Sequence, residues 1–213
     1  MFKTKAGIAV LTTLVALTGC RSDGDLTPEG ILVTRSACPA VAIPAGTGDI
    51  TLFNPAASRD ASAIDVVANI TNVRSSCSET GENVISNVTF EVQAQRRNAQ
   101  GARQVVLPYF ATVVQGGTNV VSKRVSNVGL NFADGQLRAT TTGAASAQVL
   151  RAAATLPADI RAQITRPRKA GDPNAAIDPM ADPTVRAAVT RATFELLVGF
   201  QLTQDQLRYN VTR

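Results

Sequence analysis

The sequence contains no histidine and no tryptophan, and aromatic residues make up only 4% of the chain. Without histidine there is no Ser-His-Asp or Cys-His nucleophile, no histidine general base and no histidine metal ligand. Most common hydrolase mechanisms are therefore excluded. We expect a protein that is not an enzyme and that holds no metal and no cofactor.

Charged residues are also scarce, at 17%, whereas hydrophobic residues reach 45%. A chain of 213 residues with this composition is long enough for one packed domain and short for two. We expect a single domain over residues 31–213, preceded by a cleaved segment and a short tether.

Long hydrophobic runs are confined to the N-terminus. Lys3 and Lys5 precede an uncharged, mainly apolar run from Ala6 to Leu17. A membrane-spanning helix needs about 20 apolar residues, so this run is too short to stay in the bilayer. A basic start followed by a short apolar run is typical of a signal peptide, which we place at residues 1–19.

The end of this run carries a second signal. Leu17-Thr18-Gly19-Cys20 resembles the lipobox of bacterial lipoproteins. The resemblance implies cleavage before Cys20 and attachment of lipid to it; the alternative is an ordinary secretory signal beside a free cysteine. Arg21 follows, not the Asp that resembles an inner-membrane retention signal, so by analogy we expect anchoring to the outer membrane. The domain can face the periplasm or the cell surface, and we favour the periplasmic face.

Processing would change the charge of the chain. Removal of residues 1–19 leaves 194 residues (213 minus 19) and lowers the net charge from +5 to +3, because two lysines are lost. The sequence pI of about 9.6 therefore overstates the basicity of the mature protein, and we expect no nucleic-acid partner. Residues 20–30 are polar and predict a short tether between the membrane lipid and the domain.

With Cys20 lipidated, Cys38 and Cys77 are the remaining cysteines. An exported chain enters an oxidising compartment, so this pair predicts one disulfide. The alternative is a pair of free or catalytic thiols, but neither cysteine lies in a Cys-x-x-Cys motif and no histidine is present to activate a thiol.

Alternation of apolar and polar residues predicts most of the body as strands. Turn residues, among them Gly101, Gly116-Gly117 and Asp134-Gly135, separate these runs as in an antiparallel meander. We predict an antiparallel β-sandwich, immunoglobulin-like in its broad architecture, with about 7–8 strands and one or two short helices; the alternative is a closed β-barrel. Pro108 suggests a bulge or an edge position. The expected strands are Ile50–Phe53, Ile64–Thr71, Val84–Gln95, Arg103–Gln115, Val120–Phe132, a strand from Leu137, and Phe194–Leu202.

Between Ala144 and Ala192 the strand pattern stops and alanine becomes frequent. Apolar residues recur every four positions after Pro157, which predicts a short helix, and Asp182 before Pro183 predicts a second helix that ends near Arg191. These are expected to flank a proline-rich loop over residues 165–183, which we interpret as an excursion from the sandwich.

Candidate binding residues lie in this loop and at the C-terminus. Arg166, Arg168 and Lys169 make the loop a candidate contact for an envelope protein, although an idle insertion is an equal alternative. Calcium could be bound by three aspartates of this loop, Asp172, Asp178 and Asp182. Their spacing does not match a calcium-binding loop, however, and a solvated loop is favoured.

Two other places in the sequence carry candidate groups. Thr203 and Gln206 have the spacing of a capping box, which predicts one helical turn at the C-terminus. That turn is expected to close the sandwich, in preference to a ligand role for Gln201, Tyr209 and Asn210. The adjacent basic residues Lys123 and Arg124 are interpreted as part of a solvent-exposed strand face in preference to an anionic-ligand site.

Several segments of the body resemble landmarks of a family of proteobacterial cell-envelope lipoproteins: Leu107-Pro108-Tyr109-Phe110, Val121-Ser122-Lys123-Arg124, and Gly199-Phe200-Gln201-Leu202-Thr203 through Leu207-Arg208-Tyr209-Asn210. The resemblance covers the chain from about Ile50 to its end. It implies no particular activity and no catalytic residues.

These observations lead to a functional hypothesis. We expect a non-catalytic, outer-membrane-anchored lipoprotein that serves as a structural or protein-interaction module of the envelope, held to the membrane by its N-terminal lipid. The alternative is a glycan-binding protein or a carboxylate-based hydrolase, for which Glu79, Glu82, Glu91 and Glu195 are available, although nothing in the sequence brings two of them together.

Overall fold

A computed structural model describes residues 26–27, 30–31, 36–166, 171 and 177–212. The predicted signal peptide, Cys20, Arg168, Lys169 and Asp172 lie outside the described residues. Within the expected tether, the backbone of β1 (Leu26–Thr27) pairs antiparallel with that of β2 (Gly30–Ile31).

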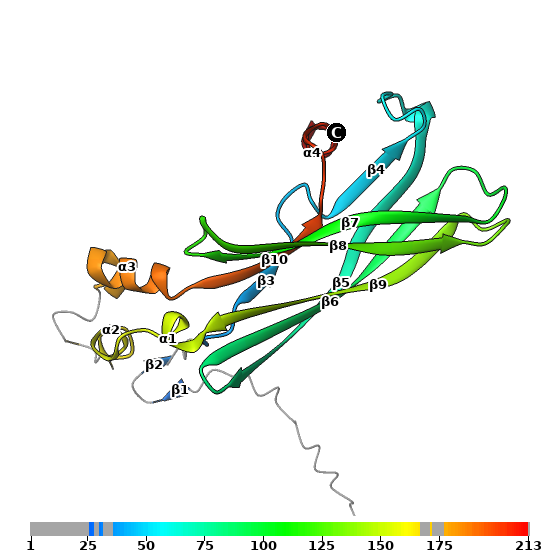
Figure 1. The fold of residues 1–213 in the computed structure, drawn as a ribbon. Coiled ribbons are helices and arrows are strands. Elements are labelled where there is room, and N and C mark those ends of the chain that lie inside the picture. The colour runs from blue at the N-terminus through cyan, green and yellow to red at the C-terminus, as the bar shows by residue number, and fades with distance from the viewer. Residues whose placement is uncertain (1–25, 28–29, 32–35, 167–170, 172–176, 213) are drawn as a thin grey trace, which may run out of the picture.

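The body consists of two four-stranded sheets (Figure 1). One has the order β3-β10-β7-β8 and the other β4-β5-β6-β9. Among the described residues each sheet is open and ends in two edge strands, so the predicted sandwich is confirmed and the closed barrel is wrong. The first sheet contains β3 (Ala40–Ala42), β7 (Arg103–Gln115), β8 (Asn119–Phe132) and β10 (Phe194–Phe200); the second contains β4 (Asp49–Phe53), β5 (Ile64–Thr80), β6 (Asn83–Arg96) and β9 (Arg138–Leu150).

Alternation along the strands supplies the core between the sheets. In β6 every second residue from Val84 to Ala94 is buried, and in β10 Leu196, Val198 and Phe200 are fully buried. Tyr109 of β7 also reaches across: its hydroxyl donates to the carbonyl of Ala144 in β9 at 2.6 Å. The two sheets are therefore joined by packing and by a polar contact.

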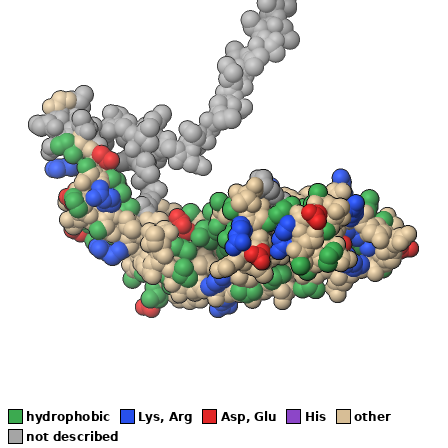
Figure 2. Space-filling model, turned by 90° about the horizontal axis from the view of Figure 1, so that it is seen from above, with side chains coloured by type: hydrophobic (Ala, Val, Ile, Leu, Met, Phe, Trp, Pro, Cys, Tyr) green, Lys and Arg blue, Asp and Glu red, His purple; other side chains and the backbone are tan. Residues whose placement is uncertain are grey.

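The face seen in Figure 2 shows how charge is distributed on this body. Basic and acidic side chains are interspersed there, with hydrophobic side chains between them, and they form no single basic patch on that face.

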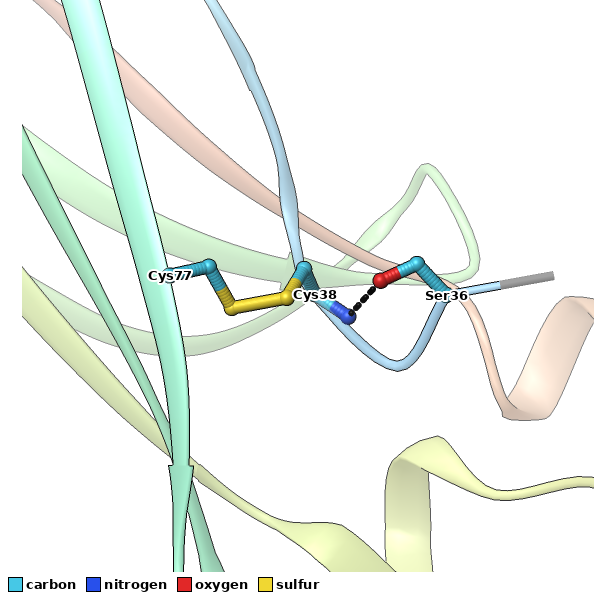
Figure 3. Close-up of a disulfide and its surroundings, with 3 residues drawn as sticks. All are labelled: Ser36, Cys38 and Cys77. Atoms are coloured by element: carbon cyan, nitrogen blue, oxygen red, sulfur yellow. Dashed lines mark hydrogen bonds between the residues drawn. A yellow bond between two sulfur atoms is a disulfide. The ribbon is translucent and has the colours of Figure 1, made fainter. Parts of the chain in front are cut away.

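The predicted disulfide is present between Cys38 and Cys77 (Figure 3). Cys38 lies two residues before the short strand β3 of one sheet, and Cys77 lies in β5 of the other. β3 was not predicted, and it pairs parallel to β10, whereas the other pairs between strands of the sandwich are antiparallel. The disulfide thus joins the two sheets close to the point where the chain enters the sandwich.

Two expectations about the strands are wrong. β7 is an interior strand between β10 and β8, and its register shift lies at Val113/Val114 and not at Pro108. The last residue of β10, Phe200, pairs with Tyr109 of β7, so Pro108 lies just beyond the end of the β7–β10 ladder. The N–H that proline lacks therefore interrupts no pair of that ladder, and proline is accommodated in an interior strand. The alanine-rich region was also expected to leave the sandwich at Ala144, but β9 continues to Leu150 because small side chains fit against β6.

The connection from β9 to β10 contains the two helices that the sequence predicted and two further short helical elements that it did not predict. It contains α1 (Arg151–Ala154), α2 (Ala158–Ile164), the 3-10 turn η2 (Pro179–Ala181) and α3 (Pro183–Arg191). A second hydrophobic cluster, formed chiefly by Leu156, Ile160, Val185, Ala188, Val189 and Ala192, holds these helices together. We call this part of the molecule the helical end. Figure 1 shows it beyond the turns that join β5 to β6 and β7 to β8.

The C-terminal helix α4 (Gln204–Thr212) is longer than the single turn that was expected. Its capping box is confirmed, because Thr203 N donates to Gln206 Oε1 at 2.9 Å and Gln206 N donates to Thr203 Oγ1 at 3.2 Å. The described helices include none that is long and apolar enough to span a membrane.

Candidate functional site

Those sequence-predicted interaction residues that the structure describes do not form one site. Arg166 is exposed just after α2, whereas Tyr209 and Asn210 lie on α4, and Figure 1 shows these two helices well apart. The side chain of Asn210 donates to the carbonyls of Gly46 and Asp49, both at 2.8 Å.

The other C-terminal candidates have similar structural contacts. The ring of Tyr209 packs edge-on against Phe53 of β4, with centroids 5.1 Å apart. Gln201 N donates to the carbonyl of Pro108 at 2.9 Å, continuing the line of β10. These contacts support the predicted closure of the sandwich by the C-terminus.

Two of the aspartates considered as calcium ligands serve as helix caps. Asp178 accepts a hydrogen bond from Met180 N at 2.9 Å, and Asp182 accepts one from Thr184 N at 2.7 Å. Capping accounts for both carboxylates without a metal ion. Across the described part of the chain no group of three or more potential metal ligands was found.

Open hollows lie at the two ends of the sandwich. The hollow at the helical end has a volume of about 690 Å³ and is lined by α1 and by Glu82, which is its one carboxylate. At the opposite end, two adjoining hollows of about 710 and 550 Å³ share Asp65 and Arg97. None of the three brings together the two carboxylates that the hydrolase alternative requires.

Asp65 is held in an ion pair between the sheets. Arg103 of β7 donates to its two carboxylate oxygens at 2.8 and 2.6 Å. This hydrogen bonding, aided by the positive charge and opposed by partial burial, lowers the pKa of Asp65 below its ordinary value. A carboxyl group in this state is ionised at neutral pH and poorly suited to act as a general acid.

Arg96 is the largest fully buried side chain and was missed by the sequence analysis. Its guanidinium donates to four backbone carbonyls in the two neighbouring turns, and it lies 5.2 Å from the centroid of the Phe132 ring. The acceptors are Gln136, Gly101, Ala99 and Ala133. Since all of them are backbone atoms, Arg96 fastens the turns after β6 and β8 and offers no free charge to a ligand.

The most exposed regular element is the first part of β8. The first nine residues of this strand, Asn119–Asn127, are exposed, although all of them except Val121, which lies at the register shift, pair with β7. β8 is an edge strand, and among the described residues its neighbour in the sheet is β7 alone. We call Asn119–Asn127 the β8 edge.

The side chains of the β8 edge are an unusual mixture for exposed positions. Val120, Val121 and Val125 are 58%, 52% and 55% exposed. Lys123 lies over the ring of Phe110 at 5.2 Å, and neither Lys123 nor Arg124 has an ion-pair partner among the described residues. The sequence predicted that Lys123 and Arg124 lie on an exposed strand face. It did not predict that both faces of the strand are exposed here, because that depends on how far the neighbouring sheet extends.

Comparisons of the chain with protein-family models, with curated proteins and with solved structures gave no match. The resemblance to envelope lipoproteins stays a prediction.

Proposed function

We propose that this protein is a lipid-anchored, non-catalytic module of the bacterial envelope that holds a protein partner. The observation that carries the proposal is the β8 edge, which combines a free strand edge with three exposed valines. Grouped apolar side chains on a soluble domain mark interaction sites more often than single exposed residues do.

The proposed anchor is the lipid on Cys20, in the outer membrane and with the domain on the periplasmic side. Multiple acyl chains give durable attachment, whereas a single chain binds only marginally. In Cys20→Ser, we expect the protein to lose lipid labelling and to move from the membrane fraction to the soluble fraction. Unchanged partitioning of this variant would rule out the anchor.

The partner proposal is tested by crosslinking in intact envelopes. A photoreactive residue is placed at Val121 in the β8 edge, at Arg166 beside the proline-rich loop, or at Arg138 on the exposed surface of β9 as the matched control. We expect one specific protein adduct from at least one of the first two positions and none from Arg138. The same set of adducts from all three positions would contradict the proposal.

A further variant addresses the loop predicted as a contact. Replacement of residues 166–183 by a short Gly/Ser linker is expected to remove the partner only if the loop holds it. An unchanged adduct would exclude the loop from the partner site and leave the β8 edge as the candidate.

The enzymatic alternative has less support from the contacts described above. Asp65 is bound by Arg103, and Glu82 stands alone in its hollow. A reproducible hydrolytic activity of the purified protein, abolished by replacing one carboxylate without loss of the fold, would overturn the non-catalytic proposal.

A further inference from the structure

We propose that the β8 edge receives an extended segment of a partner protein as an added antiparallel or parallel strand, and that this segment is apolar on one face and acidic opposite Lys123 and Arg124. The inference rests on the proposed interaction function and names the chemistry of the partner. Its support comes from the geometry, the side chains and the charge of the edge.

The geometry of the edge suits strand addition. In an antiparallel pair, alternate residues direct their N–H and C=O groups away from the neighbouring strand. No backbone hydrogen bond from Asn119–Asn127 to an element other than β7 was found in the described part of the chain. The register shift at Val121 leaves residues 122–127 as a regularly paired stretch of roughly 20 Å, which matches an incoming strand of ordinary length.

The register assigns the side chains of the edge to two rows. Lys123 pairs with Thr112 and Val125 with Phe110, so these two residues belong to the outer face of the sheet, opposite the core-facing Tyr109. Val120 joins this outer row because it pairs with Val114 beyond the register shift. An incoming strand would thus meet valine side chains and one lysine along its outer face.

The inner-facing row is polar and, like the outer row, carries a positive charge. Arg124 pairs with Ala111 and is flanked at alternate positions by Ser122 and Ser126, all of them exposed because the opposite sheet does not cover them. Opposite charges on adjacent strands stabilise a pair, whereas like charges directly opposite destabilise it. The edge therefore favours a strand with carboxylates beside Lys123 and Arg124.

Charge also argues against a second copy of this chain as the occupant. Two copies of β8 would bring two Lys123 and two Arg124 side chains to one interface, with no carboxylate in Asn119–Asn127 to neutralise them. Natural edge strands use lysines and bulges to prevent self-pairing, and β8 has both features. An edge that only prevents self-pairing needs no exposed apolar side chains, so the exposed valines distinguish the β8 edge from such an edge.

The test uses the mature protein with synthetic ten-residue peptides. One peptide alternates valine with aspartate and glutamate, a second has lysine at every acidic position, and a third has the acidic composition with prolines that prevent strand pairing. We expect the first peptide alone to bind and to protect amides of Asn119–Asn127 from hydrogen exchange. Its affinity is expected to fall about tenfold in Lys123→Glu/Arg124→Glu, which should instead bind the lysine peptide.

The matched control is Arg138→Glu/Arg151→Glu, which makes the same change in net charge at exposed residues elsewhere. It should bind the acidic peptide as the parent does, and both variants should unfold at the temperature of the parent. Binding of all three peptides alike, protection outside Asn119–Asn127, or concentration-dependent self-association through β8 would overturn the inference. If the envelope adduct forms from Arg166 but not from Val121, the proposed function holds and the β8 inference fails.

Discussion

Arg96 illustrates how a single buried residue can organise one end of the molecule. Its guanidinium serves two turns that are distant in sequence, one after β6 and the other after β8. A buried charge is costly unless its donors are satisfied, and here all the acceptors are backbone carbonyls of the two turns. The residue therefore stabilises a particular arrangement of the turns.

We predict that Arg96→Met lowers the free energy of unfolding by about 3 kcal/mol, because four buried carbonyl contacts are lost and methionine supplies no donor. Urea denaturation measures this change. The control is Arg138→Met at an exposed position, for which we expect a change within about 0.5 kcal/mol. Equal losses in the two variants would show that the buried contacts contribute little.

The ion pair between Asp65 and Arg103 predicts a pH dependence. The pKa of Asp65 is lowered in the folded state, chiefly by the hydrogen bonds from Arg103, so the unfolded chain binds a proton more readily. The pair therefore stabilises the protein fully above the unfolded-state pKa of about 4 and loses this effect as the pH falls through the folded-state pKa.

Asp65→Asn is expected to reduce stability at neutral pH and to lose less stability than the parent on acidification. Urea unfolding across this pH range gives the difference between the two proteins, which should shrink as the solution becomes acidic. Asp159→Asn, at an exposed position in α2, should follow the parent. A constant difference between Asp65→Asn and the parent would contradict the assignment.

At the scale of elements, the β6–β9 pair depends on a close approach between an aromatic ring and a glycine. Gly143 pairs with Phe90, and a Cβ at residue 143 would overlap the ring of Phe90. This glycine is required for space, since its backbone does not have a positive φ.

We predict that Gly143→Ala destabilises the protein by about 1–3 kcal/mol, because Phe90 must leave its preferred position in the core. Thermal unfolding followed by circular dichroism measures the effect. Thr142→Ala, at the adjacent exposed position, should unfold close to the parent. Tolerance of alanine at residue 143 would mean that the ring moves at little cost.

For the whole molecule, the disulfide ties the entry of the chain to the opposite sheet. Cys38 and Cys77 are separated by 39 residues, and closure of such a loop restricts the unfolded chain.

We predict that Cys38→Ser/Cys77→Ser lowers the free energy of unfolding by roughly 4 kcal/mol relative to the oxidised parent. Denaturation of both proteins, with and without reductant, tests this: the reductant should weaken the parent and leave the variant unchanged. Non-reducing peptide mapping of envelope-derived protein should recover the two cysteines joined, and free thiols there would contradict the assignment.

Local features of the sequence were sufficient to predict several elements. Alternation located β5, β6, β7 and β10, and Asp182 correctly marked the start of α3, because these signals depend on neighbouring residues alone. Pro108 misled the prediction, since its effect depends on where β10 ends, more than ninety positions later in the chain. The same limitation concealed β3, a three-residue strand defined by its partner.

The sequence by itself determined the strand periodicity, the helix caps and the pairing of two cysteines, because each follows from local spacing or from a count. Only the tertiary structure decided that Arg96 is buried, that Asp65 meets Arg103 and that the β8 edge is uncovered. Burial and exposure are properties of what packs against a residue. For Arg96 and Asp65 the relevant neighbours come from distant parts of the chain. The β8 edge is exposed because the two sheets diverge and the second sheet does not cover it (Figure 1).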